Sequence, residues 1–217
     1  MAQVPTGTTV AIASAFASAL TTSTASNATE CVLGMASTSG LANGDFVEVT
    51  SGWGRLNKRI ARVKSLSANT SITLEGIDTT NTTFYPAGTG AGSVRKITTF
   101  QTISQVTGIS SSGGDPITVD YKYLDSDVRY SINDGFNAQS YTLTMDADAI
   151  GTAGYTALKA LTEVQSDTVL KVTTRSGQIN LIPGTVALNE AVQMNDGQIN
   201  TVTCALNGTN RLTRYAS

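Results

Sequence analysis

Apolar and polar residues alternate along most of this chain, which is the period of a β-strand with one buried face. In residues 141–145 tyrosine, leucine and methionine alternate with two threonines, and residues 170–173 alternate leucine and valine with lysine and threonine. Further strand-like runs occupy residues 98–103, 178–182 and 199–206. Short runs of this kind, separated by turn residues, predict a mainly β protein with antiparallel strands.

Residues 152–165 depart from this pattern. Tyr155, Leu158, Leu161 and Val164 recur there at three-residue spacing, which predicts a short amphipathic helix with one apolar side. The threonine that opens the segment is a suitable N-cap. We expect this helix to pack against a sheet.

Two dipeptides predict tight turns in the last part of the chain. Pro183-Gly184 is a strong turn signal, and Asp196-Gly197 favours a hairpin between strands over residues 186–194 and 199–206. One helix among antiparallel hairpins predicts an all-β or α+β fold, an antiparallel β-sandwich or barrel with one short α-helix.

Residues 41–96 read as a separate compact unit inserted between residues 1–40 and residues 97–217, which together form the main β-barrel domain. Short strands within it recur at about ten-residue spacing, which predicts a small SH3-like β module. Trp53 is expected in its core, because large aromatic side chains are usually well buried.

The segment ITVDYKYLDSDVRYSIN, residues 117–133, changes character half-way. Its first seven residues alternate like a half-buried strand, but no period of either kind continues after Tyr123. Residues 124–139 contain too few apolar side chains to become ordered on their own. We therefore expect residues 124–139 to form an extended arm that becomes ordered against another molecule.

Composition favours repeated protein contacts over nucleic-acid binding. Only 14% of the residues are charged, and the formal net charge is −2 with a pI of about 5.1. A surface of hydroxyl and amide groups associates with little desolvation of charge. Arg55, Arg59 and Lys64 could form a strip that contacts phosphates, but no aromatic residues interleave with them, and a solvated strand face is the favoured interpretation.

The chain contains no histidine, which excludes Ser-His-Asp and Cys-His catalysis and histidine-ligated zinc or haem. Cys31 and Cys204 are far apart and lack the spacing of a metal site. Cys204 reads as a small core residue, and a disulfide between the two cysteines stays open as an alternative.

The remaining candidate motifs each lack a necessary part. Gly88–Gly92 has neither the lysine nor the helix that a phosphate loop requires. Asp125 and Asp127 are spaced like calcium ligands, but the glycine and the closing glutamate are missing. Asp120 and Asp125 have no nucleophile or second base beside them. We expect no enzymatic activity, no catalytic or metal-binding residues and no cofactor.

The apolar run at residues 10–20 is too polar, and lacks the preceding basic residues, for an export signal. It is also too short to span a bilayer, which takes about 20 apolar residues. We expect an initial strand here, synthesis in the cytoplasm and no membrane partner.

The order of elements from residue 98 onward resembles a known protein family. Six segments carry the resemblance, in this order: a strand (residues 98–103), a short strand (105–109), a Gly-rich turn (110–115), a strand into the arm (117–125), the helix (157–161) and the closing strand (201–208). This order is similar to the major tail tube protein of phages with long, non-contractile tails (siphoviruses). It covers residues 98–217 and the first strand, whereas residues 41–96 depart from it.

The resemblance implies a structural virion protein, located in the phage tail and made in the host cytoplasm. Six subunits would form a ring, and stacked rings would form a hollow tube with one continuous barrel around its lumen. The expected partners are other copies of the chain, a tape-measure protein, tail-end proteins and double-stranded DNA, which passes through without specific binding.

The resemblance gives the arm a role, the gripping of the next subunit or ring. Tyrosines would serve as anchors and charges would set the register. The residues expected in this inter-subunit arm are Tyr121, Tyr123, Leu124, Asp125, Asp127, Arg129 and Tyr130.

A lumen in which DNA slides should carry few lysines and arginines, because each contact of such a side chain with a phosphate strengthens salt-dependent binding of the DNA. The candidates for lining it, taken from outward positions of the expected strands, are Asp120, Thr142, Thr144, Asn180, Asn189 and Glu190.

Two other functions stay open at this level. The chain could be a different particle component, such as a decoration or tail-completion protein. It could also be a carbohydrate-binding β module, although a single tryptophan offers little of the aromatic platform that such modules use.

Overall fold

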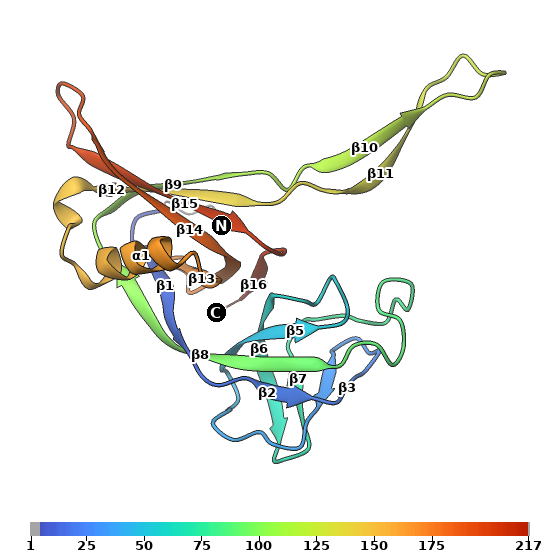
Figure 1. The fold of residues 1–217 in the computed structure, drawn as a ribbon. Helices are drawn as coiled ribbons and strands as arrows, with labels where there is room; N and C mark the ends of the chain where they lie inside the picture. The colour runs from blue at the N-terminus through green and yellow to red at the C-terminus, as the bar shows by residue number, and fades with distance from the viewer. Residues whose placement is uncertain (1–4, 217) are drawn as a thin grey trace.

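A computed structural model describes residues 5–216 of the chain. It is mainly β, with antiparallel strand pairs throughout and one α-helix, which confirms the predicted fold class. Figure 1 shows two packed units and a long hairpin, β10–β11, that projects from the upper one.

The upper unit is a curled sheet with the strand order β8-β1-β13-β14-β15-β12-β9. The short strand β16 pairs with the first part of β14. Its elements are β1 (Thr9–Phe16), β8 (Gly92–Ile103), β9 (Val106–Ser112), β12 (Ser140–Asp146), η1 (Ala147–Ala149), α1 (Ala153–Val164), β13 (Thr168–Thr173), β14 (Ile179–Gln193), β15 (Thr201–Gly208) and β16 (Thr213–Tyr215).

Helix α1 lies inside the curl of this sheet, as predicted from its apolar spacing (Figure 1). Thr152 is its N-cap, and the side chain accepts a hydrogen bond from the backbone of Tyr155. Tyr155 and Leu158 are buried against the sheet, whereas Val164, at the end of the expected apolar side, is 73% exposed. Val164 is the last residue of the helix, and Gln165 is its C-cap.

The lower unit is a small barrel built around its own hydrophobic core. Residues 20–25 pair with β8 at one end and with β4 at the other, which joins the two edges of the sheet. Its strands are β2 (Leu20–Thr22), β3 (Thr24–Ala25), β4 (Val32–Gly34), β5 (Phe46–Ser51), β6 (Arg59–Ser67), β7 (Ser71–Leu74) and the first part of β8. The SH3-like character expected for this unit is not confirmed.

Trp53 is 1% exposed in this core, as predicted, and its indole nitrogen donates to the carbonyl of Pro86 at 2.8 Å. The core also contains Cys31, Leu33 and Met35, which precede the expected boundary at residue 41. Cys31 and Cys204 are both free and buried, and they belong to the cores of different units.

The two units are held together by a third apolar cluster and by ion pairs. Ile60 of the lower unit packs with Val169, Leu181 and Tyr215 of the upper unit. Lys58 also forms a 2.5 Å ion pair with Asp167, which precedes β13. The long strand β8 runs through both units, so the barrel is fixed to the sheet by covalent and packed connections.

The projecting hairpin consists of β10 (Pro116–Tyr121) and β11 (Tyr130–Phe136). The expected half-buried strand over residues 117–123 is wrong in the isolated chain, because β10 pairs only with β11 and its side chains are mostly exposed. The segment after residue 124 is also more ordered than expected, since its second half returns as β11. We call residues 113–139 the arm.

One predicted turn is wrong and the other is confirmed. Pro183 and Gly184 lie inside β14, where they pair with Val169 and Thr168. Glycine is needed at position 184 because a Cβ atom would lie 2.4 Å from the carbonyl oxygen of Asn207 on β15. Gly197, in contrast, has a positive φ of 73° between β14 and β15, where the turn was predicted.

Candidate assembly surfaces

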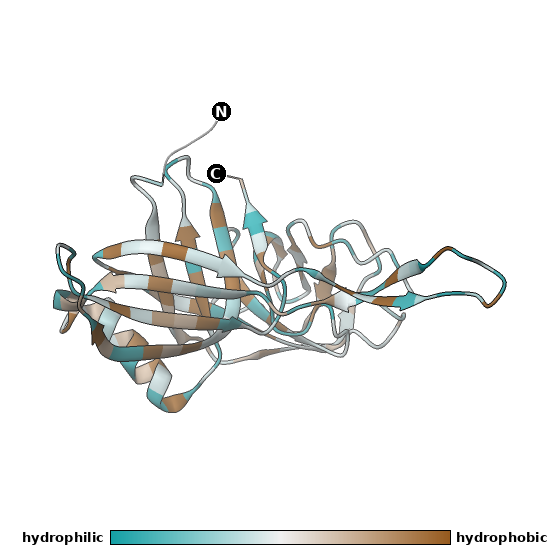
Figure 2. Cartoon of the chain, turned by 90° about the horizontal axis from the view of Figure 1, so that it is seen from above, coloured by the Kyte–Doolittle hydropathy of each residue, from teal (hydrophilic) through white to brown (hydrophobic). Residues whose placement is uncertain are grey.

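Strands β9, β12, β15 and the second half of β14 form a four-stranded sheet with two different faces. Leu143 and Met145 of β12 point into the helix-covered core. Thr142 and Thr144 alternate with them and therefore point to the other side. In Figure 2, brown and pale bands alternate along these strands.

The outer side of this sheet is polar and almost uncharged. Cross-strand partners continue the face of Thr142 and Thr144 across the neighbouring strands. The residues in these rows are Gly108, Ser110 and Ser112 of β9, Ser140, Thr142, Thr144 and Asp146 of β12, Thr201, Thr203, Ala205 and Asn207 of β15, and Thr185, Ala187 and Asn189 of β14. We call this set the polar face. It contains one acid and no lysine or arginine.

Three of the six lumen candidates lie on the polar face, namely Thr142, Thr144 and Asn189. They share it because Asn189 is paired with Thr203, and Thr203 with Thr144. A smooth Ser/Thr/Asn surface of this kind can contact a polyanion without holding it, since no cation is present to bind phosphate.

The other three candidates lie elsewhere. Asn180 shares its side of β14 with Ile182 and so faces the core side. Glu190, next to Asn189, also turns toward the helix, where it pairs with Lys159 at 3.2 Å and accepts a hydrogen bond from Tyr155. The hydrogen bond from Lys159 lowers the pKa of Glu190. Asp120 lies in β10 of the arm.

The four-stranded sheet has two edges without a strand partner in the described part of the chain. One is β9, the last strand of the sheet order. The other is the half of β14 beyond Gly184, because Thr168, the first residue of β13, is paired with Gly184. On this edge the amide of Leu188 donates to the hydroxyl of Thr162 on the helix. Open edges are sites at which a further strand can add.

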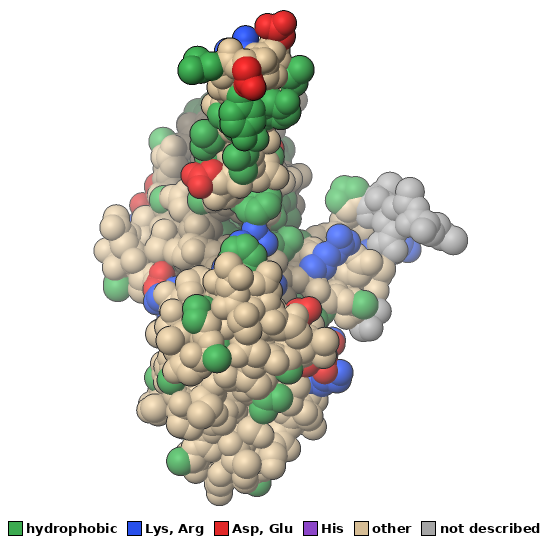
Figure 3. All heavy atoms as spheres, turned by 90° about the vertical axis from the view of Figure 1, so that its right-hand side faces the viewer, with side chains coloured by type: hydrophobic (Ala, Val, Ile, Leu, Met, Phe, Trp, Pro, Cys, Tyr) green, Lys and Arg blue, Asp and Glu red, His purple; other side chains and the backbone are tan. Residues whose placement is uncertain are grey.

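The arm is an amphipathic ribbon. Val119 is opposite Ile132, and Tyr121 is opposite Tyr130, so these four side chains share one face. Thr118 and its neighbours on the other face are polar. Val119 and Ile132 are 54% and 56% exposed, although they are β-branched apolar residues. Figure 3 shows green side chains gathered on the arm, above a body that is mostly tan.

The seven residues expected in the arm all lie at its outer half. Tyr121, Tyr123 and Tyr130 form one aromatic cluster, with ring centroids 5.4 to 5.9 Å apart. Leu124 is fully exposed in the loop beyond them. Asp125, Asp127 and Arg129 occupy the same loop, and none of them forms an ion pair within residues 5–216.

Sequence reasoning missed the apolar residues nearer the body. Ile117, Val119, Ile132 and Phe136 are all exposed on the arm. Their alternation is visible in the sequence, but it predicts a strand with a buried face. The signal that could have revealed a hairpin is the second alternating run after residue 130, which follows the polar loop.

The basic residues singled out in the sequence do not form one strip. Lys64 pairs with Glu30 at 2.6 Å. Arg59 is largely covered, and burial lowers its pKa. The guanidinium of Arg55 lies over the ring of Phe84 instead of facing solvent alone. Of these three residues, only Lys64 fits the interpretation as part of a solvated strand face.

Within residues 5–216, no three Cys, Asp or Glu side chains are grouped as ligands of a metal ion would be. None of the helices in this part of the chain combines the length and the apolar content needed to cross a membrane.

The comparisons with known proteins concern the family and the fold. The sequence profile described as "Phage tail tube protein, TTP" matches residues 51–217. The match includes most of residues 41–96, which were expected to depart from the family pattern. No protein of curated function matches the chain.

Two solved structures are similar. One is described as the virion of a native gene transfer agent (GTA) particle, with 15% identity, 54% of this chain and 89% of that chain covered, and a TM-score of 0.41. The other is the tail of an empty GTA particle with C6 symmetry, with 16% identity, 54% and 87% covered, and a TM-score of 0.39. Because the profile matches well over half of the sequence, this chain belongs to the phage tail tube protein family and is a structural protein of the virion.

Proposed function

We propose that this chain is the repeating subunit of a hollow tail tube, in which six copies form a ring, rings stack, and DNA passes along the lumen. Its role is structural and not enzymatic. The observation that carries the proposal is the combination of a cation-free polar face with a long arm whose apolar side is uncovered in the single chain.

The polar face is assigned to the lumen. DNA carries one charge per about 1.7 Å of helix axis, so each lysine or arginine on the wall would add to a salt-dependent hold on the duplex. Threonine, serine and asparagine side chains exchange hydrogen bonds with water at little cost and leave no fixed cation. The single acid, Asp146, adds weak repulsion that is screened within about 8 Å at physiological salt.

Ring closure uses the two open edges of the four-stranded sheet. The edge of β9 in one copy pairs with the open half of β14 in the next, which removes both edges and continues the polar face around the ring. The side chains along both edges are largely uncharged. Little charge is therefore desolvated when these edges meet.

The arm bridges to a neighbouring copy. An isolated two-stranded hairpin is marginally stable in water, and its stability increases when one face is covered. Burial of an exposed valine or isoleucine contributes about 1.5–3 kcal/mol, so the apolar face of the arm supplies a substantial part of the association free energy. A tape-measure protein inside the tube and tail-end proteins at its ends complete the proposed set of partners.

The test removes the apolar face without removing the arm. Val119→Ser with Ile132→Ser should leave a folded monomer and should raise the protein concentration needed for tube formation at least ~10-fold. Tube formation is measured by electron microscopy and sedimentation, and folding by circular dichroism.

The matched control places the changes on the opposite face of the same two strands, as Thr118→Ser with Ser131→Ala. It should assemble like the unaltered chain. Equal assembly of the serine variant and the unaltered chain would show that the apolar face is not an inter-subunit contact.

A further inference from the structure

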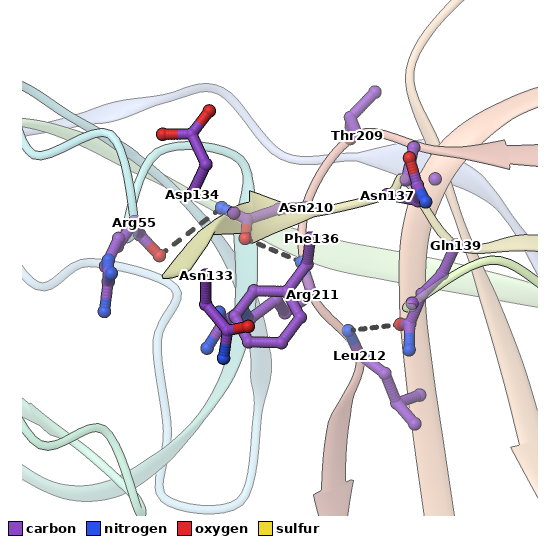
Figure 4. A pocket seen from close by; sticks show the side chains of 14 residues that line it. Arg55, Asn133, Asp134, Phe136, Asn137, Gln139, Thr209, Asn210, Arg211 and Leu212 are labelled. Atoms are coloured by element: carbon purple, nitrogen blue, oxygen red, sulfur yellow. Dashed lines mark hydrogen bonds between the residues drawn. The ribbon is translucent and has the colours of Figure 1, made fainter. Parts of the chain in front are cut away.

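A groove with both polar and apolar lining residues lies between the base of the arm and the lower unit (Figure 4). It has a volume of about 830 Å³ and is open to solvent. Three parts of the chain that are distant in sequence form its walls: Asn133–Gln139 of the arm, Gly208–Leu212 at the end of β15, and Arg55 of the lower unit. It is separate from the polar face and from the apolar face of the arm.

The groove is held in shape by hydrogen bonds between its walls. The side-chain amide of Asn210 donates to the carbonyl of Asn57 in the lower unit at 2.6 Å, and within its own wall its oxygen accepts from the backbone of Arg211 at 2.6 Å. Gln139 accepts a hydrogen bond from the backbone of Leu212 on the other side (Figure 4). The walls are therefore positioned before any occupant arrives.

The groove carries positive charge that the chain itself does not neutralise. Arg55 and Arg211 line it, and neither forms an ion pair within residues 5–216. Both guanidinium groups are stacked on aromatic rings, Arg55 at 3.2 Å from the centroid of Phe84 and Arg211 at 4.4 Å from that of Phe136. Stacking restricts each guanidinium, and a stacked guanidinium can still donate through its edge to a carboxylate.

Further cationic charge lies close by. Burial lowers the pKa of Arg59, and the neighbouring guanidinium of Arg211 lowers it further. Asp134 is the one acid among the lining residues. It is the extra residue of a bulge in β11, between the partners of Ile117 and Thr118. The groove thus suits an occupant with more than one carboxylate and some apolar surface.

The loop at the end of the arm offers such groups beside two cations, Lys122 and Arg129. Asp125 and Asp127 are exposed acids without an ion-pair partner in the described chain, and Leu124 beside them is fully exposed. Figure 3 shows red carboxylates and green side chains together at the end of the arm. The chain cannot insert its own loop, because the seven residues of β11 span ~20 Å at about 3.3 Å per residue.

We propose that the groove receives the arm loop of a second copy, with Asp125 and Asp127 of that copy bound by Arg55 and Arg211. This inference rests on the proposed function and names the contact that the arm makes. Loop and groove are different surfaces of one chain, so the contact is head-to-tail and can repeat from copy to copy along the assembly. Leu124 packs against Phe136 and Leu212 in the same contact.

The test is an exchange of charges within one chain. Arg55→Glu with Arg211→Glu, and separately Asp125→Arg with Asp127→Arg, should each raise the concentration needed for tube formation ~10-fold or more, because like charges then meet. The chain with all four changes should recover most of this loss. Arg175→Glu, an exposed charge reversal away from the groove, is the control and should assemble normally.

A second measurement covers the case in which the groove variants fail to fold. Tubes of a chain with Asp125→Cys and Asn133→Cys, which lines the groove and is exposed, should form disulfides between copies under mild oxidation, seen as a ladder of multimers on a non-reducing gel. The two native thiols are buried and do not compete. Asp125→Cys with Ser176→Cys is the control that should give no ladder.

Normal assembly of either double charge variant, failure of the fourfold variant to recover, or assembled tubes without the ladder would each overturn this contact. The groove would then be free for another tail component. The proposed function is tested separately by Val119 and Ile132, which lie outside the groove. If the Val119→Ser, Ile132→Ser chain forms no tubes and the charge exchange also fails, the proposed function as a tube subunit stands and the groove contact is rejected.

Discussion

Single residues decide how closely the layers of this molecule approach. Gly154 lies in the first turn of α1, where a Cβ atom would be 2.4 Å from the carbonyl oxygen of Thr102 on β8. Glycine inside a helix normally costs about 1 kcal/mol relative to alanine. Its presence here is explained by the close packing of the helix against the sheet.

Gly154→Ala should therefore destabilise the chain, against the usual helix preference. We expect a loss of about 1–3 kcal/mol in the free energy of unfolding, because the helix has to move away from β8. Urea denaturation of the monomer measures it. Gly54→Ala, where no atom lies within 4 Å of the new Cβ, is the control. A Gly154→Ala chain as stable as the original would show that the contact is not tight.

At the scale of single residues, the sequence predicted the role of a residue where nearby residues or its own size determine that role. The N-cap Thr152 follows from its position before an apolar helical pattern, and burial of Trp53 from its size. It did not separate Asn189 from Glu190, because the face of each depends on where the helix lies. Gly184 was read as part of a turn, since a need for close approach to Asn207 is invisible in the sequence.

Individual elements connect the two units as well as forming them. Strand β16 pairs with β14 of the upper unit, and its Tyr215 accepts a hydrogen bond from the backbone of Arg62 in the lower unit at 2.7 Å. Arg62 also forms a two-point ion pair with Glu75, at 2.5 and 2.6 Å. The hydrogen bond from Arg62 lowers the pKa of Glu75.

The contribution of the Arg62–Glu75 ion pair to stability should depend on pH. A carboxyl whose pKa is lowered by folding adds stability above its unfolded pKa of about 4.3, and this stability is lost as the pH falls through the lower folded value. Glu75→Gln should thus destabilise the chain at pH 7 and have little effect at pH 3. Urea denaturation at both values measures it, with Glu163→Gln on the exposed side of α1 as the control. A loss that is equal at both pH values would contradict the ion-pair explanation.

The sequence largely predicted which residues form strands and the helix. It did not predict which other parts of the chain pack against each of them. Apolar residues that recur every second position identified the strands around residues 98–103 and 141–145. Apolar residues at three-residue spacing identified the helix near residues 153–164. The two-residue period also predicted a buried face for β10, yet that strand extends into solvent. Alternation shows that one side of a strand is apolar but does not show whether the chain itself or another copy covers it.

At the scale of the whole molecule, the separate surfaces lie in different places and can act together. The polar face covers one side of the four-stranded part of the curled sheet, and the two open edges bound it. The arm extends away from the body (Figure 1). Membership of the tail tube family could be inferred from the order of elements, although that order did not show that the lower unit packs firmly on the sheet. Those contacts, through Ile60 and Lys58, join residues distant in sequence.

The rate of DNA ejection from phage particles tests the central claim most directly. Thr144→Arg with Asn189→Arg places two cations in one row of the polar face of every subunit, whereas Thr156→Arg with Ala160→Arg adds the same charge to the exposed side of α1. The first pair should slow or block ejection, more strongly at low salt, with tails of normal length. The second pair should eject like the original. Equal ejection rates for both pairs would contradict the assignment of the polar face to the lumen.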